Sequence, residues 1–135
     1  MTKKQPDLTP MEWAIMRVLW ERGEAIARDV WAALEPTHGW AQTTVRTMLD
    51  RLAQKGWLKQ KRIGPVFLYK PAVARDKAIH RTIRDLADRV SGGDLVDLVA
   101  YAVREADVSD DELARLEQLI RERKEKKDEP HRNDE

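Results

Sequence analysis

Hydroxyl and guanidinium side chains gather on one face of residues 42–55, a segment whose apolar residues recur with helical spacing. A guanidinium can hold a guanine edge with two hydrogen bonds, and threonine offers a hydroxyl to phosphate or a methyl group to thymine. The face therefore suits the reading of base edges in a DNA groove. The candidate DNA-binding residues of this helix are Thr43, Thr44, Arg46, Thr47 and Arg51.

A basic hairpin is predicted directly after this helix. Residues 57–62 and 66–70 have the composition of strands, and residues 63–65, Ile-Gly-Pro, are a turn signal. Basic residues on such a hairpin would contact phosphates and set the register of the protein on a duplex. They are Lys59, Lys61 and Arg62.

Two helices that could position this site precede it. A capping box at residues 9–12 opens the first helix, which Gly23 ends. The second helix is predicted over residues 27–35, with Pro36 as its stop. The order helix, helix, helix, strand, strand is typical of a winged helix-turn-helix, a mainly α fold with a small β-hairpin.

The rest of the chain is predicted to be helical, with helices over about 74–90, 95–103 and 109–124 and a charged, disordered tail at 125–135. The expected domains are thus a winged helix at 1–73 and a helical domain at 74–124. The second domain is rich in apolar residues for so small a unit, which favours burial against a second copy over folding back onto the winged helix. The candidate dimerisation residues are Ile83, Leu95, Leu98, Val99, Ala102, Val103, Leu116 and Ile120.

Charge is distributed unevenly along the chain. The formal net charge of +1 divides into +5 for residues 1–73 and −4 for residues 74–135, so an anionic partner is expected at the front half. Charged helix faces are usually just solvated, and Asp50 lies on the basic face. A winged helix used for protein–protein contact therefore stays the alternative to DNA binding, and the salt dependence of duplex binding would separate the two.

Several classes of function are not expected from this sequence. The three histidines, at 38, 80 and 131, lack the spacing of metal ligands, and no glycine-rich loop is present to cradle phosphates. We therefore expect no enzyme, no cofactor and no metal. The sequence has no cysteine and no apolar signal core at its start, which favours the cytoplasm.

Four segments resemble the penicillinase and methicillin-resistance repressor family. They are residues 8–13 (LTPMEW), 16–20 (MRVLW), 43–52 (TTVRTMLDRL) followed by Lys55-Gly56, and 69–71 (YKP). The resemblance extends over about residues 8–125. It implies a homodimeric transcriptional repressor that binds inverted-repeat operators in double-stranded DNA, with half-sites of the TACA/TGTA type.

The resemblance also implies how repression ends. In well-known members a membrane metallopeptidase sensor relieves repression, and the repressor is cut at an Asn-Phe pair in the penultimate helix. Tyr101-Ala102 occupies the aligned position here, so a protease would need another preference, and a change of dimer geometry without cleavage is the alternative. A second branch of the family senses copper through C-terminal cysteines, a mechanism that this sequence excludes.

Overall fold

The computed structural model describes residues 5–105 and 107–128. The chain divides into two compact units between Ile83 and Arg84. The first unit therefore extends ten residues past the boundary expected at residue 73. Ala78 explains the difference, because it is fully buried in the core of the first unit although it lies on the helix that continues into the second.

Helix α1 (Pro10–Arg22) begins and ends as the sequence predicts. The Thr9 hydroxyl accepts a hydrogen bond from the Glu12 N–H at 3.2 Å, and the Glu12 carboxylate accepts one from the Thr9 N–H at 2.9 Å. This capping box satisfies two of the donors that a helix start leaves free. Gly23 closes the helix with φ +88°, a conformation that strongly favours glycine.

Helix α2 (Ala27–His38) follows the two-residue strand β1 (Ala25–Ile26). The predicted stop at Pro36 is wrong, because the helix continues for two more residues. The Thr37 hydroxyl donates to the Leu34 carbonyl at 3.3 Å, and the Gly39 N–H donates to the Glu35 carbonyl at 2.8 Å. These bonds hold the last turn together although proline contributes no donor to it.

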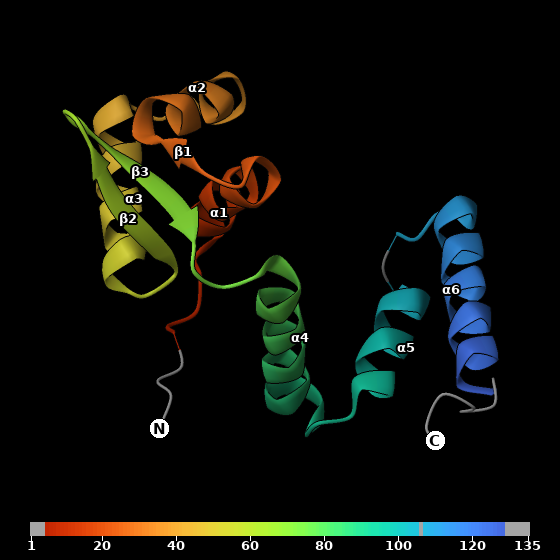
Figure 1. Cartoon of the computed structure of the whole chain (residues 1–135). Helices are drawn as coiled ribbons and strands as arrows, with labels where there is room; N and C mark the ends of the chain where they lie inside the picture. The colour runs from red at the N-terminus through yellow and green to blue at the C-terminus, as the bar shows by residue number, and fades with distance from the viewer. Residues whose placement is uncertain (1–4, 106, 129–135) are drawn as a thin grey trace. The chain divides into compact units, whose positions relative to one another are not determined.

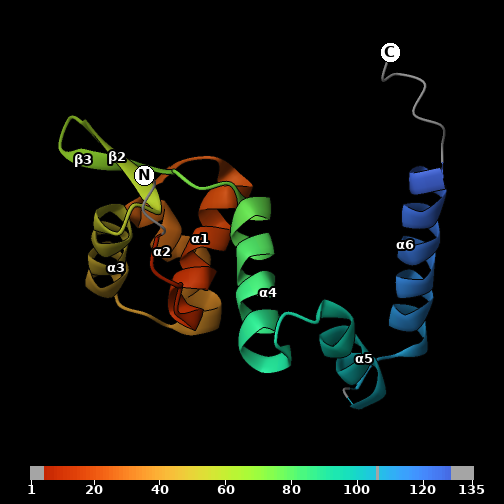
Figure 2. The ribbon, with the colours of Figure 1, turned by 90° about the horizontal axis from the view of Figure 1, so that it is seen from below.

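Helix α3 (Gln42–Gln54) and the hairpin of strands β2 (Leu58–Ile63) and β3 (Val66–Pro71) lie side by side (Figures 1 and 2). In the described chain, the strands form an antiparallel sheet in the order β1-β3-β2. Together with the three helices, this sheet makes a winged helix. The largest fully buried side chains of its core are Trp57, Tyr69, Ile15, Met16, Leu19, Leu49, Leu52, Val30 and Val45.

Three helices complete the chain: α4 (Arg75–Ser91), α5 (Leu95–Glu105) and α6 (Asp110–Asp128). Helix α6 reaches Asp128, so the tail expected from residue 125 is helical at 125–128, while 129–135 lie outside the described residues. Acidic residues in its first turn and Lys126 and Lys127 in its last complement the helix dipole. No helix in the described ranges is long and apolar enough to cross a membrane.

Candidate nucleic-acid interface

Helix α3 has one buried face and one open face. Val45, Leu49 and Leu52 are fully buried, which turns the opposite side outward. The candidate DNA-binding side chains of this helix are all exposed, and they lie on or beside that open side. They are Thr43, Thr44, Arg46, Thr47 and Arg51.

Two recesses flank the open face of α3. The first lies between α3 and the start of α1, where Thr44, Thr47 and Arg51 line it with Met11. The second lies between α3 and the hairpin. It brings Arg46 and Thr43 together with two residues that sequence reasoning missed. These are Arg28 and Gln42.

Arg28 and Gln42 belong to helix starts that lack a side-chain cap. The N-cap residues of α2 and α3 are Ile26 and Ala41, and neither makes a side-chain hydrogen bond to its helix. Backbone N–H groups of both first turns are therefore available to an external acceptor, and the helix dipoles favour an anion there. The absence of Ser, Thr, Asp or Asn at positions 26 and 41 was the signal in the sequence.

The hairpin presents its basic residues on two faces. Successive side chains of a strand point to opposite sides, and Gln60 faces α3, where it contacts Asp50. Lys59 and Lys61 therefore lie on the side turned away from α3. Lys70, which is paired with Lys59 across the strands, shares that side and was not among the predicted residues.

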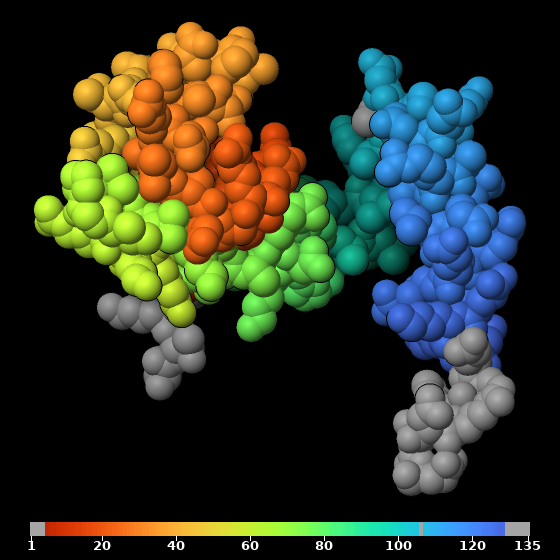
Figure 3. Space-filling model, turned by 45° about the horizontal axis from the view of Figure 1, so that its top comes forward, coloured from red at the N-terminus to blue at the C-terminus, as the bar shows by residue number. Residues whose placement is uncertain are grey.

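Arg62 lies on the other face of the hairpin and is held by it. Its Nε donates to the Gly64 carbonyl at 3.2 Å, and its guanidinium lies 5.7 Å from the centre of the Phe67 ring. These contacts place a positive charge at the tip of the hairpin. Figure 3 shows the hairpin's side chains as a light-green lobe at the margin of the first unit.

Asp50 ties the hairpin to helix α3. Tyr69 donates its hydroxyl hydrogen to the Asp50 carboxylate at 2.6 Å, and Gln60 donates to the same oxygen at 3.0 Å. Burial and the neighbouring carboxylate raise the pKa of Tyr69 to about 12, so the hydroxyl stays a donor at physiological pH. The charge of Asp50 is thus engaged within the protein, which accounts for an acidic residue beside the basic face.

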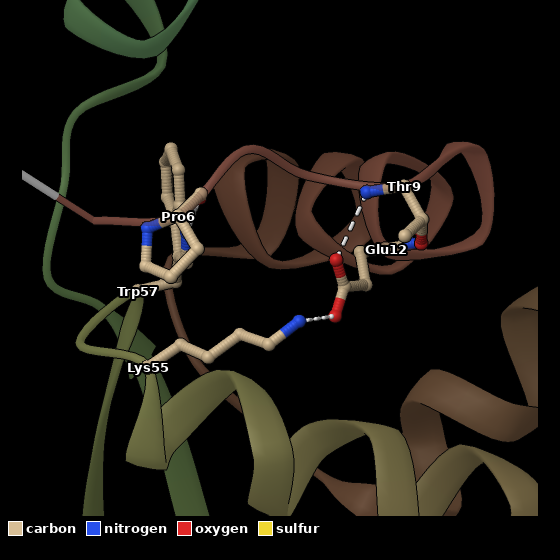
Figure 4. Close-up of polar contacts among 5 residues, drawn as sticks. All are labelled: Pro6, Thr9, Glu12, Lys55 and Trp57. Carbon is tan, nitrogen blue, oxygen red and sulfur yellow. Dashed lines mark hydrogen bonds and ion pairs between the residues drawn. The ribbon is translucent and has the colours of Figure 1, made fainter.

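An ion pair fixes the start of α1 to the end of α3 (Figure 4). Lys55 Nζ lies 2.6 Å from the second carboxylate oxygen of Glu12, whose side chain is 6% exposed. Burial raises the pKa of Glu12, but hydrogen bonds from Lys55 and from Thr9 outweigh it, so the pKa lies below the ordinary value of 4.5. Glu12 is therefore charged at neutral pH, and it positions the open face of α3 relative to α1.

The chain that carries this winged helix and basic face matches a known family over most of its length. The family model described as penicillinase repressor matches residues 8–122. The chain belongs to the penicillinase repressor family. As a family of transcriptional repressors, it is a class of DNA-binding proteins rather than of enzymes.

Named proteins and solved structures of the penicillinase repressor family resemble the chain. The penicillinase repressor of Bacillus licheniformis is 30% identical over 127 residues, covering 94% of this chain and 99% of that protein. The methicillin resistance regulatory protein MecI of Mammaliicoccus sciuri is 26% identical, covering 89% and 98%. The solution structure of the DNA-binding domain of the repressor BlaI has a TM-score of 0.50 and 34% identity, covering 55% of this chain and 90% of that one.

Outside its winged helix, this penicillinase repressor family member exposes many apolar side chains. No side chain on α5 or on the described α6 is buried within the chain. Among the predicted dimerisation residues, Ile83, Val99, Ala102, Val103 and Ile120 are exposed, whereas Leu95, Leu98 and Leu116 are partly buried. Tyr101 and Ala102, which were predicted only as a possible cleavage pair, are exposed on α5.

Proposed function

We propose that this chain is a transcriptional repressor that binds operator sequences in double-stranded DNA as a homodimer. The observation that carries the proposal is the open face of α3, where threonine and arginine side chains are exposed between α1 and the hairpin. An α-helix fits the major groove, and the N-terminal residues of such a helix are the ones that reach base edges.

The surroundings of α3 suit the phosphates on either side of a groove. The uncapped starts of α2 and α3 offer backbone N–H groups, and Arg28 lies in the first turn of α2. Phosphate contacts of this kind orient a protein on DNA without reading sequence. We therefore assign base reading to Arg46 and the α3 threonines, and phosphate contacts to Arg28 and the hairpin.

The apolar surface of the second unit supports the proposed dimer. The side chains left exposed on α5 and α6 would be costly to keep in water in a free monomer. A second copy would cover them and would also give the protein the two-fold symmetry of an inverted repeat. We infer a cytoplasmic location, because the proposed target is DNA.

Relief of repression by a membrane metallopeptidase sensor stays a prediction. The aligned bond, Tyr101–Ala102, lies inside helix α5. A protease binds its substrate in an extended conformation, so this helix would have to open locally before the bond could be cut. Cleavage there would separate the winged helix from α6 and remove the avidity of the dimer.

Selection of binding sites from a random duplex library tests the proposal. The wild-type chain should enrich an inverted repeat, and Arg46→Ala should weaken binding to it by about 1–3 kcal/mol and relax the preference at one position of each half-site. Arg17→Ala is the matched control, because Arg17 is exposed on α1.

The outcome also separates DNA binding from protein–protein contact. A DNA-binding protein loses affinity steeply as salt rises, since each neutralised phosphate releases about one counterion. No enrichment, together with a flat salt dependence, would contradict the proposal and favour a protein-interaction module.

A further inference from the structure

Two residues of the hairpin hold Asp50 through one of its carboxylate oxygens. The Tyr69 hydroxyl donates to Oδ1 at 2.6 Å, and the Gln60 amide donates to the same oxygen at 3.0 Å and to the Tyr69 hydroxyl at 3.3 Å. Tyr69 is 1% exposed and lies on β3, the middle strand of the sheet, where it is paired with Ala25 on β1 and Gln60 on β2. The sheet thus fixes the position of the hydroxyl, and the hydroxyl turns the Asp50 carboxylate toward the hairpin.

Arg46 is the basic residue with which Asp50 would otherwise pair. The two residues are four positions apart on α3, and side chains with that spacing share a helix face with their Cβ atoms about 5–6 Å apart. Opposite charges in this arrangement attract and form ion pairs. Among the ion pairs of the described residues, however, none joins Arg46 to Asp50. The Arg46 side chain is exposed, and it lines the recess between α3 and the hairpin together with Tyr69.

The charges of Arg46 and Asp50 both act on the Tyr69 hydroxyl. Burial raises the pKa of Tyr69 most strongly, the hydrogen bond to Asp50 raises it further, and the positive charge of Arg46 lowers it. The guanidinium of Arg46 is therefore near the hydroxyl and near the carboxylate bound to it. An arginine that reaches along its own helix to a carboxylate four residues later is withdrawn from a base edge in front of the helix.

We propose that Tyr69 is a positioning residue that keeps Asp50 turned away from Arg46 and so leaves the Arg46 guanidinium available to a guanine edge. The inference rests on the proposed function, because it takes Arg46 as a residue that reads a base. The apparent affinity of a protein falls in proportion to the fraction of molecules whose binding group is available. Removing the Tyr69 hydroxyl lets the carboxylate rotate toward the guanidinium, and that fraction then falls.

Binding-site selection and affinity measurements with Tyr69→Phe test the inference. Phenylalanine conserves nearly all the volume of the buried ring and removes only the hydroxyl. The duplex is the inverted repeat selected by the full-length wild-type chain, and affinities are measured by fluorescence anisotropy. We expect the affinity of Tyr69→Phe for it to fall about three- to tenfold. The loss of sequence preference should be confined to the base pair at which Arg46→Ala relaxes it.

Two combined variants separate positioning from a structural role. In Tyr69→Phe with Asp50→Asn, no carboxylate remains to attract Arg46, so the preference at that base pair should return although the hairpin has lost the same hydroxyl. In Tyr69→Phe with Arg46→Ala, the change at Tyr69 should cost no further affinity, because the side chain that it positions is gone. Thr82→Val is the control, because it removes an exposed hydroxyl that bonds only within α4. Thermal melts of all variants verify that the winged helix is folded.

The outcomes are distinct. A Tyr69→Phe chain that keeps the wild-type affinity and preference overturns the inference and leaves the proposed function intact. A loss that is equal at every base pair, and that Asp50→Asn does not restore, also overturns it, because Tyr69 would then act only through the placement of the hairpin. Loss of the preference in Asp50→Asn alone overturns it too, because Asp50 would then support Arg46 on DNA. A wild-type chain that selects no duplex overturns the proposed function, and this inference with it.

Discussion

Glu12 performs two tasks with its two carboxylate oxygens. One oxygen caps helix α1 through the Thr9 N–H, and the other binds Lys55 at the end of α3. A buried carboxylate is costly unless its hydrogen bonds are satisfied, and here both oxygens have a donor. The residue thus joins the local stability of one helix to the placement of another.

Glu12→Gln separates these two tasks. Glutamine at this position can still cap the helix, because its side-chain carbonyl accepts from the Thr9 N–H, but it cannot form the ion pair with Lys55. We expect the free energy of unfolding at pH 7 to fall by about 1–2 kcal/mol, measured by urea denaturation. Glu24→Gln is the control, because Glu24 is exposed in a loop.

The difference between wild type and Glu12→Gln should depend on pH in one direction. The pKa of Glu12 lies below its ordinary value in the folded chain, so its stabilisation is complete above pH 4.5 and is lost as pH falls through the folded pKa. The two unfolding free energies should therefore converge as the pH falls below 4.5. If the difference in unfolding free energy between the two proteins stayed constant from pH 7 to pH 3, the charge of Glu12 would not be the cause of the stabilisation.

At the scale of elements, the hydrogen bond between Tyr69 and Asp50 links the hairpin to α3. A double-mutant cycle with Tyr69→Phe and Asp50→Asn measures this link. We expect each single change to lower stability and the coupling energy to be about 1 kcal/mol. Tyr101→Phe, on exposed α5, should have little effect. Additive effects of the two changes would show that the hairpin is held by other contacts.

The hairpin itself should contribute charge and little sequence preference. Changing Lys61 and Arg62 together to Ala should weaken binding to all duplexes alike and make the log–log salt slope shallower by up to about 2. Because the two side chains lie on opposite faces of the hairpin, the single variants identify the face that meets phosphate. Equal slopes for wild type and the double variant would place the hairpin outside the interface.

The elements that the sequence predicted well carry strong local signals. The capping box of Thr9 and Glu12 located the start of α1, and the apolar period of α3 located its open face. Strand β1 was missed because two residues are too short to alternate, and its partner is β3, more than 40 residues later. The predicted end of α2 failed because hydrogen bonds around Pro36 completed the last turn without the proline donor.

The parts of the candidate site that escaped prediction depend on contacts between distant residues. In the sequence, Asp50 is a negative charge that opposes DNA binding, and only the fold brings Tyr69, 19 residues away, to donate a hydrogen bond to its carboxylate. Arg28 and Gln42 join the site because two helix starts converge beside the hairpin. The periodicity of apolar residues predicts which face of one helix is buried, but it does not predict which faces of different helices come together.

At the scale of the whole molecule, we expect the apolar surface of α5 and α6 to form the interface of the proposed dimer. Leu98→Asp should split the dimer, because it would place an unpaired charge in an apolar interface. Sedimentation should then find a monomer. In a binding assay, its affinity for the operator should be far below that of wild type, while its affinity for a half-site should be retained. Leu98→Met conserves volume and should stay dimeric. A dimeric Leu98→Asp would locate the interface elsewhere.

All five tryptophans of the chain, at 13, 20, 31, 40 and 57, belong to the winged helix, and the second unit has none. Intrinsic fluorescence excited at the red edge of indole absorption therefore reports on one half of the molecule alone, whereas circular dichroism sums the helices of both. An unfolding experiment followed by the two signals needs no label to distinguish the halves. If the second unit depends on its partner copy, dilution will shift the dichroism curve and leave the indole curve in place.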